Sequence, residues 1–204
     1  MIDPIVLLAF IPAALALNFT PGADMMFCLG QGLRHGPRAA WAASAGISTG
    51  SMIHVTLAGL GLGAVVAHSP WLFDVIRWAG VAYLLWLAVQ ALRAGPMKAK
   101  PQGSTHAYRE GLMVNLTNPK VILFVLAFIP QFVDPARAVL PQFLAYGAVL
   151  ATGGFFINGL VGLFAGGIGK RLASSPGFSK GLGWVSAGIF SALAVRLAVM
   201  ERAS

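Results

Sequence analysis

The chain has 204 residues, of which 57% are hydrophobic and only 10% are charged, and its mean hydropathy is +0.78. A soluble domain carries about a quarter charged residues, so this composition excludes a soluble globular protein and predicts an all-α integral membrane protein. The formal net charge is +8, but the bases lie mainly in short loops between apolar runs, where they orient a membrane protein. Nucleic-acid binding is therefore disfavoured.

The sequence also limits the chemistry that the protein can perform. The single cysteine, Cys28, rules out an internal disulfide and a CxxC redox pair. The glycine-rich run 166–170 lacks the first glycine and the Ser or Thr of a phosphate-binding loop, and no spacing among the four histidines suits a metal ion. We therefore predict no metal, no cofactor and no enzyme activity, and expect any transport to be driven by a gradient.

Six apolar stretches are long enough to cross a bilayer, which takes about 20 residues. They lie near residues 4–31, 39–67, 71–93, 110–133, 139–168 and 181–200. The start Met1-Ile2-Asp3-Pro4 lacks the basic segment of a cleaved signal peptide, so we expect the first stretch to be retained as a spanning helix.

The polar segment 95–109 is typical of a flexible cytoplasmic linker. It would join two halves, about 1–94 and 110–204, of a single transporter domain spanning 1–204. Three spans in each half force the halves into opposite orientations. We expect two inverted three-helix repeats whose first helices are broken.

The loop charges predict the orientation. The loops after the first, third and fifth stretches carry nine bases, and the alternate set carries three. The nine are Arg34, Arg38, Arg93, Lys98, Lys100, Arg109, Lys170, Arg171 and Lys180; the three are Arg137, Arg196 and Arg202. The positive-inside rule then places both termini outside the cytoplasm.

The first apolar stretch is interrupted by Asn18-Phe19-Thr20-Pro21-Gly22-Ala23-Asp24. Proline lacks a backbone donor and Pro-Gly continues a helix poorly, so we expect the helix to break here. Backbone groups freed inside a bilayer need partners from protein or from a water-filled cavity, which makes the break a candidate binding site. The backbone of Pro21–Asp24 can hold a substrate carboxylate, while Asn18 and Thr20 can bond a zwitterionic ligand or satisfy the freed backbone.

Two titratable groups in the first half are candidates for proton coupling. Asp24 directly follows Pro21-Gly22, and an intramembrane carboxylate is costly enough to be a functional candidate by default. Its other interpretation is a residue at the cytoplasmic edge of the bilayer. His54 lies mid-span and is either a proton-coupling group or a hydrogen-bonded packing element.

The fourth apolar stretch contains a second break, Asn115-Leu116-Thr117-Asn118-Pro119-Lys120. The polar side chains Asn115, Thr117 and Asn118 can bind the ligand or the freed backbone. Lys120 can pair with Asp24, hold an anionic group, or extend to the cytoplasmic headgroups. Two Pro-interrupted segments in corresponding halves point to the binding site of a transporter.

Small residues indicate where helices pack. Ala42, Gly46 and Gly50 recur every four residues, and this spacing lets helices approach closely in lipid. Such exposed faces permit a homodimer without requiring one.

These residues, in this order, resemble the LysE/RhtB family of amino-acid exporters over nearly the whole chain. The matching segments are Asn18–Asp24; Gly46, Gly50 and His54; Ala79–Leu84; Gly111 and Asn115–Lys120; and Phe128–Asp134. The resemblance implies six hydrophobic segments and the export of amino acids or their derivatives across the bacterial inner membrane in exchange for protons.

Two departures from the family pattern bear on the substrate. The usual Pro-Gly-Pro is Pro21-Gly22-Ala23 here, which makes the break less rigid, and Ser51 stands where an acidic residue often precedes the histidine. Neutral amino acids of the threonine, homoserine or leucine type are therefore favoured over basic ones. The alternative is a metal-ion or other small-solute exporter on the same scaffold, which would need carboxylates or histidines clustered in both halves.

Overall fold

The computed structural model describes residues 4–68, 70–93, 95, 106–165 and 175–199. All regular elements within these ranges are helical, as the composition predicts. In chain order they are α1 Pro4–Phe19, α2 Ala23–His35, α3 Pro37–His68, α4 Pro70–Arg93, α5 Ala107–Leu116, α6 Pro119–Ala127, the short 3-10 helix η1 Ile129–Phe132, α7 Val139–Leu163 and α9 Pro176–Val199.

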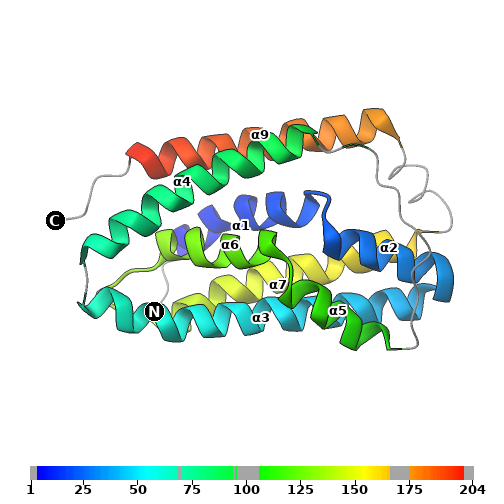
Figure 1. The fold of residues 1–204 in the computed structure, drawn as a ribbon, viewed down its shortest axis with the longest axis horizontal. Helices are drawn as coiled ribbons and strands as arrows, with labels where there is room; N and C mark the ends of the chain where they lie inside the picture. The colour runs from blue at the N-terminus through cyan, green and yellow to red at the C-terminus, as the bar shows by residue number, and fades with distance from the viewer. Residues whose placement is uncertain (1–3, 69, 94, 96–105, 166–174, 200–204) are drawn as a thin grey trace.

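The helices form an elongated bundle (Figure 1). The helices α4 and α9 pair along one face, while α3 and α7 pair in the opposite layer. The helices α1 and α6 lie between these pairs, and the broken segments α1–α2 and α5–α6 run in opposite directions. Each break thus lies inside the bundle, surrounded by protein on several sides.

Two of the described helices are long and apolar enough to cross a membrane unaided, namely α7 and residues 176–195 of α9. The bent pairs α1–α2 and α5–α6 pass the same test when each pair counts as one span, which makes up to 4 spans. The other two expected spans, 39–67 and 71–93, lie on α3 and α4. On α4 the apolar segment, Trp78–Arg93, is shorter than a full span. The described residues of α3 do not reach the combination of length and hydropathy that a span requires.

The polar side chains of α3 are tied to its neighbour α7. The hydroxyl of Ser44 donates to the carbonyl of Phe155 at 2.7 Å, and Ser48 donates to Ala151 at 3.0 Å. These hydroxyls lower the hydropathy of α3 but face protein, where a hydrogen bond satisfies each of them. The low hydropathy of α3 therefore does not mean that its polar side chains need water, because α7 supplies their hydrogen-bond partners.

Both predicted breaks are present. The axis turns by 55° between α1 and α2, and by 54° between α5 and α6. Gly22 takes the position before α2 in an extended conformation, and Asn118 takes the same position before α6 with Pro119 as the first helical residue. Proline is well suited to that first position because its missing N–H would be unpaired there in any case.

The predicted linker 95–109 is too long at its C-terminal end. The helix α5 begins at Ala107, because Ala107 is buried in a small apolar cluster with Phe27, Cys28 and Ala43. Residues 96–105 lie outside the described residues.

Four of the described bases lie at one end of the bundle, whereas Lys120 lies at the second break and Arg137 in the turn between η1 and α7. At that end Arg34 lies in the last turn of α2, α3 begins at Pro37 followed by Arg38, α4 ends with Arg93, and α5 begins two residues before Arg109 (Figure 1). At the opposite end α1 begins and α9 ends.

A cluster of aromatic rings fills the bundle near that opposite end. Phe10 of α1 lies 5.0 Å from Tyr146 of α7 and 6.1 Å from Phe128 between ring centroids, and Phe132 of η1 lies 5.3 Å from Phe10. Phe10 is completely buried. The cluster joins the first half of the chain to the second.

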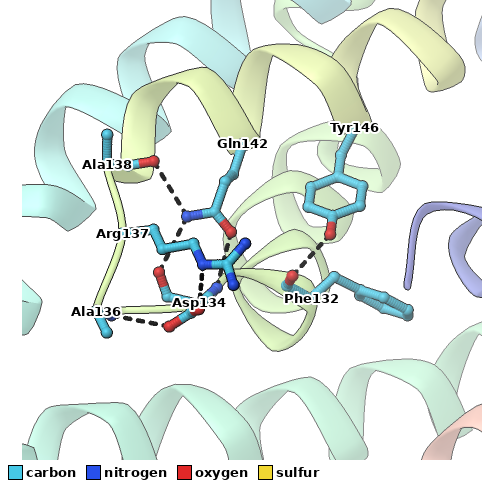
Figure 2. Close-up of polar contacts among 7 residues, drawn as sticks. All are labelled: Phe132, Asp134, Ala136, Arg137, Ala138, Gln142 and Tyr146. Atoms are coloured by element: carbon cyan, nitrogen blue, oxygen red, sulfur yellow. Dashed lines mark hydrogen bonds and ion pairs between the residues drawn. The ribbon is translucent and has the colours of Figure 1, made fainter. Parts of the chain in front are cut away.

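The turn between η1 and α7 is held by one side chain (Figure 2). Gln142 donates to the carbonyls of Asp134 and Ala138 at 2.9 and 3.0 Å and accepts from the amide of Asp134 at 2.8 Å. Arg137 pairs with Asp134 at 3.0 Å, and the Tyr146 hydroxyl donates to the carbonyl of Phe132 at 2.8 Å. These bonds fix the start of α7 beside the aromatic cluster.

Glycines bring α3 and α5 into backbone contact. A Cβ added at Gly46 would collide with the carbonyl oxygen of Tyr108, and one added at Gly111 would collide with the carbonyl of Ala43. At Gly50 it would lie 2.7 Å from the side-chain oxygen of Asn115. Gly46 and Gly50 thus face α5, while Ala42 is partly buried against the same small cluster as Ala107.

The substitution Gly46→Ala should destabilise the protein by about 1–3 kcal/mol, because the added methyl group forces α3 and α5 apart. Thermal unfolding of the purified protein in detergent would measure this. Gly188→Ala on α9 is the matched control, since a Cβ there meets no described atom within 4 Å. Equal unfolding temperatures for Gly46→Ala and the wild type would contradict the α3–α5 contact.

Candidate functional site

The carboxylate of Asp24 lies inside the protein, in the first turn of α2, with 7% of its surface exposed. Protein therefore shields this carboxylate from bulk water. A helix N-terminus stabilises a negative charge, and among the described side chains none caps α2. One carboxylate oxygen, Oδ2, accepts a hydrogen bond at 2.9 Å from Nδ2 of Asn115.

Asn115 connects the two breaks. It is completely buried near the end of α5 and reaches α2 through Asp24 and α3 through Ser51, whose hydroxyl lies 3.4 Å from Oδ1 of Asn115. The backbone carbonyl of Asn115 lies 3.3 Å from Nε2 of His54. Polar residues of both halves thus meet at one side chain.

Lys120 makes a second connection between the breaks, and its partner is not Asp24. Its Nζ donates to the carbonyls of Leu17 and Thr20 at 3.1 and 2.9 Å. These two carbonyls stand at the end of α1, where helical carbonyls lack partners within their own helix. The α6 residue Lys120 therefore completes the hydrogen bonding of α1.

The two breaks enclose a small cavity of about 20 Å³. Its polar lining comes from both halves: Asn18, Thr20, Asp24, Ser48, Ser51, Lys120 and Asn158. A space of this size holds about one water molecule and is too small for an amino acid. In this conformation the site is closed.

Each break contains a buried polar atom without a hydrogen-bond partner. Across the described ranges, Oδ1 of Asp24 and Nδ2 of Asn118 remain unbonded, although Oδ1 of Asn118 accepts from the amide of Lys120 at 3.0 Å. Leaving a buried polar group unpaired costs about 1–3 kcal/mol. Asp24 lines the cavity, so its free oxygen is an acceptor at this site, whereas Asn118 is not among the lining residues.

The predicted site residues divide into three groups. Asn18, Thr20, Asp24 and Lys120 line the cavity, and Gly22, Asn115 and Asn118 contact these residues directly. Pro21 is partly buried within the break. Thr117 and Pro119 are exposed, and the Thr117 hydroxyl donates within its own helix to Met113 at 2.9 Å, so the structure does not bring them to the cavity.

His54 lies apart from the cavity lining. It borders a larger, mostly apolar groove of about 420 Å³ between α3, α6 and α7, with Leu57, Ile122, Leu126 and Phe143 among the other lining residues. Its contact with the carbonyl of Asn115 is the link between this groove and the Asp24 cluster.

Some buried polar residues carried weak or no sequence signals. Tyr83 of α4 donates to the carbonyl of Lys120 at 2.7 Å, which fixes that residue from the side of α4. Asn158 also lines the cavity. In the sequence it is indicated only by being a single asparagine in a long apolar run. Gln31 is completely buried, and neither polar atom of its side chain has a partner within the described part of the chain.

Comparison with known proteins now gives the family. The profile of the LysE type translocators matches residues 15–201, which include both breaks. The chain belongs to the LysE type translocator family. As a LysE translocator it is a membrane transport protein and not an enzyme.

Several curated relatives of this LysE translocator are similar over most of their length. It is 37% identical over 150 residues to an uncharacterized membrane protein of Vibrio cholerae, covering 71% of this chain and 73% of that one. It is 37% identical over 144 residues to the homoserine/homoserine lactone efflux protein of Salmonella typhimurium, covering 68% and 70%. It is 28% identical over 200 residues to the leucine efflux protein of Enterobacter sp., covering 81% and 93%. No solved structure matches the chain.

The substitution Asn115→Ala should lower stability by about 1–3 kcal/mol, because it leaves both oxygens of the buried Asp24 carboxylate without a partner. Thermal unfolding in detergent checks this. Ser51→Ala is the matched control and should cost less, since its bond to Asn115 is 3.4 Å long. If Asn115→Ala costs as much in an Asp24→Ala background as in the wild type, the two side chains do not interact.

Proposed function

We propose that this LysE translocator is a secondary transporter that exports neutral amino acids by exchange with protons. The observation that carries the proposal is the closed polar cavity between the two breaks, with one carboxylate oxygen of Asp24 left free. Relatives named as efflux proteins for homoserine, homoserine lactone and leucine support the choice of substrate class.

The polar groups around the cavity suit a zwitterion. The free Oδ1 of Asp24 can accept from a substrate ammonium group. The backbone amides of the uncapped first turn of α2 can donate to a substrate carboxylate. The remaining lining, Leu17, Met25, Ile47, Val121 and Leu150, is apolar and suits a neutral side chain.

Transport requires the cavity to open alternately to the two sides. At about 20 Å³ it must expand to admit an amino acid, so the closed conformation corresponds to an intermediate between the inward-open and outward-open forms. Two broken helices supply the natural hinges, since few interhelical bonds need to change when a short segment rotates about a break.

Asp24 is the proposed proton carrier. It is buried, it carries the free oxygen, and it belongs to the same cluster as the groups proposed to bind substrate. Protonation and substrate ammonium binding then compete for one carboxylate, which is the simplest route to obligatory exchange. His54 is the second candidate, acting through the carbonyl of Asn115.

A metal-ion or other small-solute exporter on the same scaffold is the alternative. Metal binding would need a group of at least three His, Cys, Asp or Glu side chains, and a search of the described residues finds none. No specific observation favours this alternative over an amino-acid exporter.

The proposed location is the bacterial inner membrane. The basic helix ends would face the cytoplasm and the chain termini the periplasm, in accordance with the positive-inside rule. The proposed partners are an amino acid, protons and membrane lipid. A homodimer would have to use a face other than Gly46 and Gly50, which pack against α5.

The substitution Asp24→Asn should abolish proton-driven transport and also weaken amino-acid exchange, because the same carboxylate is proposed to take up the proton and to bind the substrate ammonium group. Asparagine retains an oxygen that accepts from Asn115 but cannot take up a proton. In proteoliposomes, accumulation of labelled leucine, threonine or homoserine driven by a pH gradient should fall to background, and counterflow without a gradient should fall with it.

The matched control is Glu110→Gln on α5, which makes the same chemical change away from the cavity and should leave both fluxes unchanged. Gradient-driven accumulation by Asp24→Asn equal to that of the wild type would exclude Asp24 as the proton carrier. Absence of flux of every amino acid tested in the wild type, with and without a gradient, would overturn the proposed function.

A further inference from the structure

Lys120 already holds an amine against the wall of the proposed substrate site. Its Nζ donates to the carbonyls of Leu17 and Thr20 at 3.1 and 2.9 Å, and Leu17, Thr20 and Lys120 all line the same cavity as Asp24. Two carbonyl oxygens near a carboxylate form the environment that an ammonium group of a substrate would need.

The position of this amine is fixed by the fold. The amide of Lys120 is bonded to Asn118 at 3.0 Å, and its carbonyl accepts from Tyr83 at 2.7 Å. Gly22 leaves the room that the amine occupies, since a Cβ at Gly22 would lie 3.0 Å from Nζ. The side chain is therefore held from α1, α4 and the second break together.

The site thus contains acceptors for two ammonium groups, of which one set is taken. The carbonyls of Leu17 and Thr20 are occupied by Lys120, whereas Oδ1 of Asp24, which is buried to more than nine-tenths, is free. A zwitterionic amino acid brings one ammonium group, and that group has an acceptor. A basic amino acid brings two, and the second would meet the amine of Lys120.

We infer that Lys120 occupies a built-in second ammonium subsite formed by the carbonyls of Leu17 and Thr20, and so restricts this translocator to substrates with a single ammonium group. The inference rests on the proposed function and deepens it. Lys120 acts here as a specificity-determining residue: it excludes lysine, ornithine and diamines by occupying the position that their second ammonium group would take.

The test compares substrates in Lys120→Ala, which removes both the amine and the stem that fills the space beside it. In proteoliposomes, counterflow of labelled lysine relative to labelled leucine should rise about tenfold or more over the wild type, the factor that one charge-assisted hydrogen bond provides. A merely structural role for Lys120 would lower both fluxes and leave their ratio unchanged.

Two further variants separate charge from volume and from surface effects. Lys120→Arg keeps a cation at the site and should keep lysine excluded, with a lysine-to-leucine ratio within about twofold of the wild type, a difference of less than RT. Lys180→Ala removes an exposed lysine of α9 and should change neither flux.

If Lys120→Ala carries no flux, thermal stabilisation of the detergent-purified protein replaces transport as the readout. Lysine should then raise the unfolding temperature of the variant and not that of the wild type. No stabilisation of the variant by lysine, or an unchanged flux ratio, overturns the inference while leaving the proposed function intact. A wild type that transports lysine as well as leucine also overturns it, whereas a wild type inactive with every amino acid refutes the proposed function itself.

Discussion

The structure depends on the exchange of hydrogen bonds between two broken helices. Each break frees backbone groups inside a bundle where lipid offers no partners, so the partners must come from protein. The end of α1 obtains them from Lys120 of the second break, and the start of α2 receives the side chain of Asn115 through Asp24. Each half of the chain therefore completes the polar groups of the other half. A fold arranged this way cannot form one half of its site without the other.

The surrounding helices make these crossed contacts possible in different ways. The glycines of α3 let α5 approach until backbone meets backbone, which brings Asn115 within reach of Asp24. Tyr83 of α4 holds the other break by its hydroxyl. The hydroxyls of α3 bind α7 through carbonyls, so the helices around the cavity are joined by directed bonds as well as by apolar packing. The result is a rigid frame around two bent segments.

The sequence predicted the membrane class and the positions of both breaks, because Pro-Gly and Asn-Pro act locally on the backbone. It also indicated Asp24 and Asn115 as candidate site residues, because they are polar residues within apolar stretches. It did not predict what Lys120 binds, since three partners were open and the choice depends on where the end of α1 lies in space. Thr117 and Pro119 were included because they belong to the motif, yet a helix turns successive residues to different sides, and these two face outward. The extra start of α5 at Ala107 was missed because burial against Phe27 and Ala43, distant in sequence, stabilises it.

The helices are packed by different kinds of contact at the two ends of the bundle. Toward the basic end, glycines at positions 32, 46 and 111 press directly on the main chain of neighbouring helices. Toward the other end the contacts are between rings, from Phe10 to Phe132 and Tyr146. The ring contacts can be released by repacking of side chains, whereas main-chain contact is released only when whole helices separate. The two ends of the bundle should accordingly open by different kinds of movement, side-chain repacking at one end and separation of helices at the other.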